Sequence, residues 1–576
     1  MESTSDVLDL FHPLIACWFR EDVGEPTDVQ ARSWTAISRG EHSLITAPTG
    51  SGKTLAAFLW AINGFVTGDL ETGHTRVLYV SPLKALNNDI RRNLSGPLEA
   101  LERTFGEAGQ AFPEIQVLTR SGDTPQSERR RMVRRPPEIL ITTPESLNIL
   151  LSSRGGRSML TDLSTVILDE IHAVFGEKRG VHLITAVDRL VPMSGEFQRI
   201  GLSATIRPIE TVAEFVGGFT ADGNGGYEPR TVHIHRSDAR KAYDLTVRFP
   251  EEAYDVAEEG TVWDSFVDDF TDRIARNRST LIFANNRRLA ESLTQKINEA
   301  TDGHVAYAHH GSLSREIREE VERRMKAGDL RAIVATNSLE MGIDIGDLDE
   351  VLLVQSPSSV SAAIQRVGRA GHRVGEVSRG TFFPTHPHDI LDATVLTGAV
   401  LSHDIEAVRP VLCPLDVLAQ VIISMVGVER WDIDALFDHI RTSFPYRDLQ
   451  REHFDLVLNM LAGRYRHARI RELKARVSID GLENTVQARP GALQALYMSG
   501  GTIPDRGYYQ LRIQNGRARI GELDEEFVWE ASVGQMFTFG TQSWRIQEIT
   551  HNDVLVEPAS RGRSVPPFWK GEGFER

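Results

Sequence analysis

The stretch "APTGSGKT", residues 47–54, constrains the fold of this chain more than any other segment. It lies between an apolar strand-like run, SLIT, and an apolar helix-like run, LAAFLWAI. Gly50 and Gly52 permit a tight turn whose backbone N–H groups surround phosphate oxygens, and the N-terminus of the following helix adds a positive end. The sequence therefore predicts a phosphate-binding loop that contains Thr49, Gly50, Ser51, Gly52, Lys53 and Thr54.

The stretch "LDEIHAV", residues 168–174, places two carboxylates at the end of an apolar run. Taken alone it fits half a metal site, an acid/base pair or an ordinary charged strand end. A zinc site does not fit, because the H-E-x-x-H spacing is absent and no cysteine lies nearby. A phosphate loop needs a carboxylate on a neighbouring strand to hold magnesium, and Asp169 fits that role. We therefore expect Lys53 to reach the β/γ-phosphates, Thr54 and Asp169 to ligate Mg²⁺, and Glu170 to activate the attacking water.

Apolar runs that alternate with helix-length segments predict an α/β fold with parallel sheets covered on both faces. Ligands bind beyond the carboxyl ends of the strands in such sheets, and each predicted strand ends there in a polar cluster. The predicted strands are HSLITAP (42–48), RVLYVSP (76–82), EILITTP (138–144), TVILDE (165–170) and RIGLSAT (199–205) in a first block, and TLIFAN (280–285), RAIVATN (331–337) and EVLLVQS (350–356) in a second. The loop TADGNGGYEPR (220–230) is the expected break between the blocks.

The pattern changes after about residue 390. Three helices with short connections are predicted at 414–426, 432–440 and 451–461, which would fit a small helical or winged-helix domain. Strand-like pieces bounded by Gly, Pro and Asn follow from about residue 475, namely GYYQLRI, EFVWEA, MFTFG, SWRIQEI and DVLVEP. A chain of 576 residues is too long for one core, so several domains are expected.

Composition excludes some classes of protein. The net charge of 64 − 80 = −16 argues against coating nucleic acid by bulk electrostatics, although a local basic channel is compatible with it. Cys17 and Cys413 are the only cysteines, so neither a disulfide framework nor a cysteine-rich zinc site is expected. The N-terminus lacks the features of a signal peptide, and no run of 18 apolar residues occurs. We expect a soluble, cytoplasmic, nucleoid-associated protein with no membrane partner.

The ordered motifs within residues 15–375 resemble those of superfamily 2 helicases of the DExH type. Besides the two stretches already described, the matching segments are PTDVQ (26–30), SPLKAL (81–86), RSGD (120–123), TTPESL (142–147), SAT (203–205), IFANNRR (282–288), HHGSLS (309–314), ATNSLEMGIDIG (335–346) and QRVGRAGH (365–372). The resemblance implies two tandem RecA-like lobes that bind ATP and Mg²⁺ between them. It also implies that Gln30 reads adenine, and that Gly342 and Asp344 contact the nucleotide from the second lobe.

The resemblance further implies that Arg369 is an arginine finger supported by Arg366. Because both come from the second lobe, hydrolysis would require closure of the lobes over ATP. His172 and Gln365 would link the lobes across the ATP. Many relatives carry arginine where His372 stands, so the residue that completes the phosphate clamp is left open between His372 and its neighbour Arg373.

The resemblance also assigns residues to coupling and to nucleic acid. Those expected to couple hydrolysis to strand movement are Ser203 and Thr205. Those expected to contact nucleic acid are Ser81, Pro82, Gly122, Thr143, Pro144, Asn285, Gly311 and Thr336. Two basic stretches leave alternatives open. Residues 129–135 suit a solvated helix face as well as a nucleic-acid contact, and residues 464–476 favour a nucleic-acid contact.

The C-terminal third resembles the large helicase-related, or Lhr-type, helicases. The segments that carry this resemblance are SGGTIPDRGYYQLR (499–512), IGELDEEFVWE (520–530), TFGTQSWRIQEI (538–549) and PPFWKGEG (566–573). The expected domains are a RecA-like domain at 1–228, a second at 229–390, a winged-helix domain at 391–472 and a β-rich domain at 473–576. Trp544 first, and Trp569 second, are candidates for stacking on a base, with a core role for Trp544 left open.

The Lhr-type resemblance implies ATP-dependent 3′-to-5′ translocation on single-stranded DNA. It also implies the unwinding of DNA–DNA or RNA–DNA duplexes, in DNA repair. An RNA helicase or RNA-remodelling ATPase is the alternative, because DExH motifs do not report sugar identity. A clamp that binds nucleic acid without unwinding it would be expected to lack Lys53, Glu170 or the arginine finger, and all three are present.

Overall fold

The computed structural model describes most of the chain. The described residues are 6–48, 50–82, 84–221, 226–238, 241–249, 259–301, 303–310, 315–340, 346–371, 376–464, 474–499, 501–503, 508–514, 519–539, 542–550 and 553–559. They form two compact units, Met1–Gly501 and Thr502–Arg576, and each is described by itself. In the part of the chain that is described, no helix is long and apolar enough to cross a membrane.

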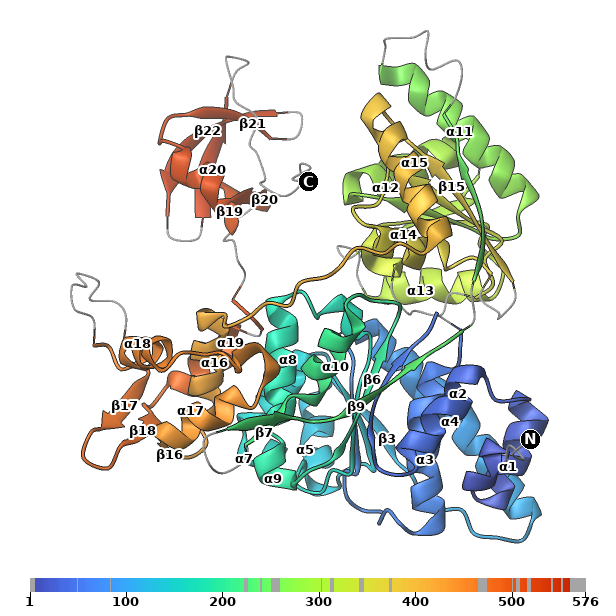
Figure 1. Ribbon diagram of the computed structural model, residues 1–576. Helices are drawn as coiled ribbons and strands as arrows, with labels where there is room; N and C mark the ends of the chain where they lie inside the picture. Colours follow the sequence, from blue (N-terminus) through green and yellow to red (C-terminus); the bar gives the residue numbers. More distant parts are fainter. Residues whose placement is uncertain are drawn as a thin grey trace. The chain divides into compact units, whose positions relative to one another are not determined.

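The first lobe is built on a seven-stranded sheet in the order β3-β4-β2-β5-β6-β1-β9, and every pairing in it is parallel. Its strands are β1 (His42–Thr46), β2 (Val77–Val80), β3 (Val117–Arg120), β4 (Ile139–Thr142), β5 (Thr165–Leu168), β6 (Gln198–Ser203) and β9 (Val232–Arg236). The main helices, which flank this sheet in Figure 1, are α1 (Pro13–Trp18), α2 (Asp28–Ile37), α3 (Lys53–Thr67), α4 (Lys84–Glu107), α5 (Gln126–Arg134), α6 (Pro144–Leu151), α7 (Arg154–Ser158), α8 (Lys178–Asp188), α9 (Val191–Ser194) and α10 (Ile209–Gly217). Two separate apolar clusters that meet the sheet form the core, as expected for strands covered on both faces.

The second lobe repeats this plan with a six-stranded, all-parallel sheet in the order β10-β15-β14-β11-β13-β12. Its strands are β10 (Ala242–Val247), β11 (Thr280–Ala284), β12 (Ala306–His309), β13 (Ala332–Ala335), β14 (Glu350–Val354) and β15 (Val377–Phe383). Its helices are α11 (Glu259–Arg276), α12 (Arg287–Ala300), α13 (Arg315–Lys326), α14 (Val360–Val367) and α15 (Pro387–Ser402). The predicted α/β class and its parallel sheets are confirmed.

A winged-helix region completes the first unit. It contains α16 (Leu415–Val426), β16 (Trp431–Asp432), α17 (Ile433–Arg441), α18 (Arg451–Leu461), β17 (Val477–Asp480), β18 (Thr485–Ala488) and α19 (Ala492–Ser499). The strands form a small antiparallel sheet in the order β16-β18-β17, in which β17 and β18 make the wing. The three predicted helices are confirmed within two residues at each end.

The winged-helix region is joined to the first lobe by buried polar contacts. The Ser443 hydroxyl donates to Asp188 Oδ2 at 2.6 Å, and the other oxygen of Asp188 pairs with Arg199 at 2.7 Å. The backbone N–H of Phe219 donates to the carbonyl of Thr442 at 2.8 Å. Because Arg199 and Asp188 are almost wholly buried, this junction is a fixed part of the core.

The second unit is a small mixed sheet in the order β20-β19-β23-β22-β21. Its elements are β19 (Tyr508–Ile513), β20 (Arg519–Asp524), α20 (Glu525–Glu530), β21 (Met536–Phe539), β22 (Gln542–Ile549) and β23 (Asp553–Pro558). Four of the five predicted strands are present, but EFVWEA is wrong, because it forms helix α20. That helix buries the adjacent residues Phe527 and Val528 and leaves Trp529 exposed, a spacing that a strand does not produce.

The structure moves the expected domain boundaries. Strand β9 pairs with β1, so the first lobe extends past residue 228. The segment expected to be a loop, 220–230, overlaps two short paired strands, β7 (Phe219–Ala221) and β8 (Tyr227–Pro229). Helix α15 packs on β10, so the second lobe runs to about residue 402 rather than 390. The wing strands β17 and β18 pair with β16, which places the start of the β-rich unit at Thr502 rather than residue 473.

The Asp188→Ala variant tests the buried junction. It leaves the Arg199 guanidinium buried without its carboxylate, which costs about 3–5 kcal/mol for a buried pair. We expect a clear loss in the free energy of unfolding of the first unit, measured by urea titration. Arg276→Ala, which removes an exposed i,i+4 pair with Asp272, should cost less than about 1 kcal/mol. Equal costs for the two variants would contradict the account of the junction.

Candidate ATP site and nucleic-acid interface

Strand order divides the carboxyl edge of the first sheet into two halves. The phosphate loop, the LDEIH stretch and the SAT stretch follow β1, β5 and β6, which are adjacent in the sheet. The loops expected to contact nucleic acid follow β2, β3 and β4, which form the other half. The two halves meet where β2 pairs with β5, so this one strand pairing joins them within the sheet.

The conformation of the phosphate loop depends on Gly52 and on its contact with Gln30 of α2. Gly52 has a φ of +78°, and a Cβ at this position would lie 2.5 Å from Gln30 Nε2. Gln30 Nε2 donates to the Gly52 carbonyl at 3.3 Å, and Gln30 Oε1 accepts from the Thr27 N–H at 2.9 Å. The structure therefore places Gln30 against the loop, where it ties the start of α2 to the turn that would hold the phosphates.

Lys53 is the first residue of α3 and lies directly across from the acidic residues of the site. Its Nζ donates to the carbonyls of Ala47, at 2.5 Å, and Pro48, at 2.8 Å. Burial lowers the pKa of Lys53, while the charges of Glu170 and Asp169 oppose that change. The lysine is thus set in the electrostatic field of the carboxylate pair, as phosphoryl transfer requires.

The two carboxylates after β5 are buried side by side. Tyr79, on the adjacent strand β2, donates a short hydrogen bond to Asp169 Oδ2, and the Glu170 N–H donates to Asp169 Oδ1 at 2.8 Å. Burial and the charge of Glu170 raise the pKa of Asp169 to about 6. Glu170 has a left-handed φ of +49°, a conformation that non-glycine residues adopt mostly where a function requires it.

His172 connects the LDEIH stretch to the SAT stretch within the first lobe. Its Nδ1 accepts the N–H of Ala204 at 3.1 Å and lies 3.5 Å from the Ser203 hydroxyl. Burial and the charge of Lys53 lower the pKa of His172 to about 4, so the imidazole is neutral near pH 7. Because Nδ1 is an acceptor, its 3.4 Å approach to Glu170 Oε2 is not an ion pair.

In the second lobe, Arg366 and Arg369 are both buried and both contact Glu340. Arg366 Nε pairs with the Glu340 carboxylate at 3.1 Å, and its Nη1 donates to Asn285 Oδ1 at 3.1 Å. Arg369 Nη2 donates to the Glu340 carbonyl at 2.9 Å.

Burial raises the pKa of Glu170, and the positive charges of Lys53 and Arg369 oppose that rise. Arg369 therefore acts on Glu170 from the opposite lobe, while Arg366 organises the second lobe itself.

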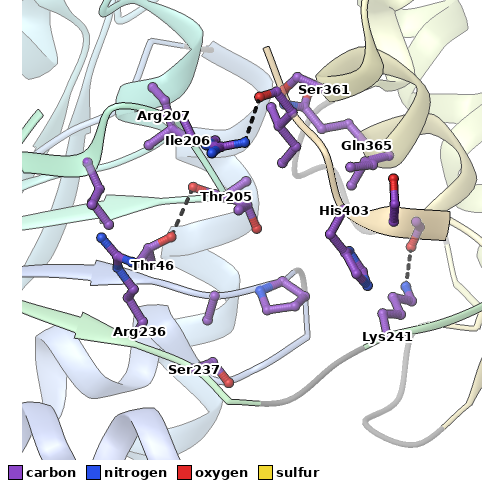
Figure 2. A pocket seen from close by; sticks show the side chains of 18 of the residues that line it. Thr46, Thr205, Ile206, Arg207, Arg236, Ser237, Lys241, Ser361, Gln365 and His403 are labelled. Carbon is purple, nitrogen blue, oxygen red and sulfur yellow. Dashed lines mark hydrogen bonds between the residues drawn. The ribbon is translucent and has the colours of Figure 1, made fainter. Parts of the chain in front are cut away.

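A cavity of about 1170 Å³ opens between the lobes. Figure 2 shows Thr46 and Thr205 on one side of it and Gln365 and His403 on the other. Gln365 Nε2 donates to the Ser361 hydroxyl at 3.3 Å, and this hydrogen bond lies within the second lobe. The sequence-based link between His172 and Gln365 is a prediction for lobe closure.

The residues at the carboxylate pair fit Mg²⁺. Asp169 supplies a carboxylate and Thr54, in the first turn of α3, supplies a hydroxyl, both hard oxygen donors. A divalent cation there would offset the burial of negative charge that raises the pKa of both carboxylates. Among the described residues no group of three or more His, Cys, Asp or Glu could hold a metal.

The described polar side chains in the loops of the nucleic-acid half are engaged within the first lobe. Ser81 and Thr143 are almost fully buried, and Thr143 Oγ1 accepts from the Ser146 N–H at 3.3 Å as the N-cap of α6. Arg129, from the basic run, donates to the Gly122 carbonyl at 2.7 Å and so supports that loop. Pro82 and Pro144 lie beside these residues, which places all five loop positions on one half of the edge.

In the second lobe the predicted nucleic-acid contacts follow adjacent strands as well. Asn285 follows β11 and Thr336 follows β13. Several predicted positions lie outside the described residues, namely Thr49, Gly311, Gly342, Asp344, His372, Arg373, Trp569 and most of the basic stretch 464–476. His309 pairs with Glu322 and His310 with Glu291, which supports structural roles for both.

The stacking role predicted for Trp544 is not supported. Trp544 is 6% exposed and belongs to the apolar core of the second unit, together with Ile546 on the same face of β22. A base cannot stack on a buried ring, so the core interpretation that the sequence left open holds for this residue.

Sequence reasoning missed two residues of the site. Tyr79 was treated only as part of an apolar strand, although a hydroxyl in a fully buried strand needs a partner and so signals a polar neighbour. Glu340 follows the strand AIVA closely and gave the same kind of signal as Asp169, a carboxylate beyond the end of a buried strand. Neither signal names the partner, because both partners are distant in sequence.

Three family models match the chain in the order of its parts. Residues 27–215 match the DEAD/DEAH box helicase model, and residues 264–374 match the helicase conserved C-terminal domain. Residues 398–565 match the winged helix domain of the large helicase-related protein. The first two matches cover the two parallel-sheet lobes, and the third covers the winged-helix region and most of the second unit.

Relatives match almost the whole chain. The Lhr helicase/probable uracil glycosylase of Mycolicibacterium smegmatis is 42% identical over 99% of this chain and 40% of its own length. The ATP-dependent helicase Lhr-Core of Methanothermobacter thermautotrophicus is 38% identical over 99% of this chain and 66% of its own length. The structure of Mycobacterium smegmatis helicase Lhr bound to ssDNA and AMP-PNP has a TM-score of 0.82 at 42% identity, over 94% of this chain and 68% of that one. The chain belongs to the Lhr helicase family.

Membership of the Lhr family confirms the resemblance that the sequence carries. One family model covers both the winged-helix region and most of the β-rich unit. The chain spans about 40% of the length of the M. smegmatis relative and 66% of the M. thermautotrophicus Lhr-Core relative, so it corresponds to part of those proteins.

Tyr79→Phe tests the electrostatics of Asp169, the predicted magnesium ligand. The hydrogen bond from Tyr79 lowers the pKa of Asp169, so its removal should raise that pKa above about 6. Protons compete with Mg²⁺ for the carboxylate, so affinity for the metal is lost as pH falls through the pKa. We expect the variant to need several-fold more Mg²⁺ for half-maximal ATP hydrolysis, with a larger gap at pH 6 than at pH 8. A Mg²⁺ requirement equal to that of the wild type at both pH values would contradict this assignment.

Proposed function

We propose that this Lhr family protein is an ATP-dependent helicase that translocates 3′-to-5′ on single-stranded DNA. It unwinds DNA–DNA or RNA–DNA duplexes, in DNA repair. The observation that carries the proposal is that positive charges from both lobes converge on one buried carboxylate. Lys53 and Arg369 both act on the buried Glu170, from the first and the second lobe respectively.

ATP hydrolysis follows from this arrangement. Phosphoryl transfer needs positioning and charge neutralisation, which Lys53 and Arg369 supply, and a positioned base for the water, which Glu170 supplies. Asp169 and Thr54 would hold Mg²⁺, which would supply neutralisation of the phosphate charge at this site. Burial keeps the pKa of Glu170 raised, which makes the carboxylate a stronger base than an exposed one.

Movement follows because the arginine finger and the phosphate loop belong to different lobes. Closure over ATP brings them together, and release after hydrolysis lets the lobes separate. In each lobe the predicted nucleic-acid loops follow adjacent β-strands of that lobe's own sheet. A nucleic-acid strand bound by both lobes is therefore held at two points. Alternating closure and opening changes the distance between these points, which is the mechanical basis of translocation.

DNA as the tracked strand is supported by the relative from M. smegmatis, whose structure is bound to ssDNA and AMP-PNP. Because Trp544 is buried, we assign the base-stacking contact to Trp569. The 3′-to-5′ polarity and the RNA–DNA duplex are part of the proposal and rest on the resemblance to Lhr-type helicases.

A strand-displacement assay tests the proposal. We expect ATP-dependent displacement from DNA–DNA and RNA–DNA duplexes that carry a 3′ DNA tail, and none from 5′-tailed duplexes. ATP hydrolysis should depend on added single-stranded DNA and should fall at least about 100-fold in Glu170→Gln, which removes the base but keeps the size of the side chain. Glu299→Gln, an exposed glutamate on α12, is the matched control and should behave as the wild type.

Three results would overturn parts of this proposal. Strong ATP hydrolysis without any nucleic acid would contradict a nucleic-acid-driven motor. Preferential stimulation and displacement on an RNA tracking strand would replace the DNA assignment with an RNA helicase. Normal ATP hydrolysis with no displacement of any duplex would indicate a clamp.

A further inference from the structure

The start of helix α8 lies between the ATP site and the nucleic-acid loops. The helix begins at Lys178, six residues after His172, and its second residue is Arg179. The Arg179 side chain contacts the segments that follow β2 and β4. Its Nη2 donates to the carbonyl of Pro82 at 2.5 Å, in the loop after β2. Its Nε donates to Glu145 Oε1 at 2.6 Å, in the first turn of α6, the helix that follows β4.

The contact with Glu145 is a two-point one. Besides the Nε bond, Arg179 Nη2 donates to Glu145 Oε2 at 3.1 Å, so the guanidinium and carboxylate meet in a fork. Both side chains are about 70% covered, with 30% and 27% of their surface exposed. Burial would raise the pKa of Glu145, but the hydrogen bond and charge of Arg179 outweigh it, so the pKa is lowered. The pair is therefore charged and ordered near neutral pH.

Glu145 and Pro82 each stand beside residues of the predicted backbone grip. Pro82 follows Ser81, and Glu145 follows Thr143 and Pro144 at the N-terminus of α6. One arginine thus bridges two loops whose strands, β2 and β4, are neighbours in the sheet. Without this bridge, the described contacts that join these loops to each other are strand pairings and the Ser81 N–H bond to the Thr142 carbonyl.

The same turn of α8 is fastened to the winged-helix region. Lys178 Nζ pairs with Asp416, in the first turn of α16, at 2.8 Å. Further along, the Ser152 hydroxyl at the end of α6 lies 2.6 Å from the Ser424 hydroxyl of α16. Helices α6 and α8, which carry Glu145 and Arg179, are therefore backed by α16.

We propose that Arg179 is a positioning residue that holds the loops after β2 and β4 as one surface for the nucleic-acid backbone. The proposal rests on the proposed function, because it supposes that these loops grip the tracked strand. Arginine suits the position because its planar fork satisfies a carboxylate at two points while a third bond reaches the Pro82 carbonyl. Lysine would retain the charge but could not reproduce this geometry.

ATP hydrolysis titrated with single-stranded DNA tests the proposal in the full chain. We expect Arg179→Ala to raise the DNA concentration for half-maximal stimulation about tenfold. The KM for ATP and the rate at saturating DNA should stay within about twofold, because the ATP site is untouched. Arg179→Lys should recover less than half of the loss on a logarithmic scale. Full recovery by lysine would show that charge alone matters and would overturn the positioning role.

Glu145→Gln decides whether Arg179 acts through the loop or touches a phosphate itself. If Arg179 positions the loop through Glu145, the variant weakens the fork and should raise the half-saturating DNA concentration. If Arg179 binds a phosphate directly, loss of the nearby negative charge should strengthen DNA binding. Tighter binding by Glu145→Gln, measured by fluorescence anisotropy of a labelled strand, would overturn the proposal.

Arg157→Ala is the matched control. Arg157 also joins the first lobe to the winged-helix region, through Glu429 at 2.9 Å, and its described side-chain contact lies away from both loops. We expect its DNA requirement to stay within about twofold of the wild type. If Arg179→Ala lowers the melting temperature, the milder Arg179→Lys and Glu145→Gln variants carry the decision.

The two levels of the account fail in different ways. A wild-type protein that single-stranded DNA neither binds nor stimulates would overturn the proposed function, and the role of Arg179 with it. A wild-type protein that is stimulated normally, together with an Arg179→Ala variant of unchanged DNA requirement, would overturn the role of Arg179 alone.

Discussion

Two carboxylates buried side by side after β5 are the constraint on which the rest of the site depends. Burial raises the pKa of both Asp169 and Glu170, and the charge of Glu170 raises that of Asp169 further, so the arrangement is stable only where positive charge and hydrogen bonds surround it. Lys53 comes from α3 and Tyr79 from β2, and Arg369 approaches from the second lobe. The carboxylate pair therefore gathers groups from both lobes around the point where phosphate chemistry would occur.

The order of the strands connects the ATP half of the sheet edge to the nucleic-acid half. Because β2 pairs with β5, the strand that carries Tyr79 also leads into the nucleic-acid loop at Ser81. His172, which accepts a hydrogen bond from the SAT stretch, lies shortly before α8 in the chain. The second residue of α8, Arg179, contacts Glu145. Two short covalent routes thus connect the ATP half of the edge to the nucleic-acid half, and the winged-helix region is fixed to the second of them by Lys178 and Asp416.

The sequence predicted the parts that local patterns determine. The phosphate loop and the buried strands were readable because each function lies at the end of a continuous apolar run. The helix formed by EFVWEA was missed because a short apolar run does not distinguish helix from strand. The burial of Trp544 was readable in principle, since Trp544 and Ile546 alternate with polar residues. The role of Arg179 was not, because its partners are 34 and 97 residues away and "EKRG" looks like a solvated charged turn.

Mutual strengthening of ATP and DNA binding is the most direct measure of this account. The affinity for a labelled single strand is measured with and without a non-hydrolysable ATP analogue and Mg²⁺, and the affinity for the analogue is measured with and without the strand. The account predicts that each ligand strengthens the other by the same factor, since linkage is reciprocal, and that the factor falls towards one in Arg369→Ala. DNA affinity that is independent of nucleotide in the wild-type protein would contradict coupling between the two halves of the sheet edge.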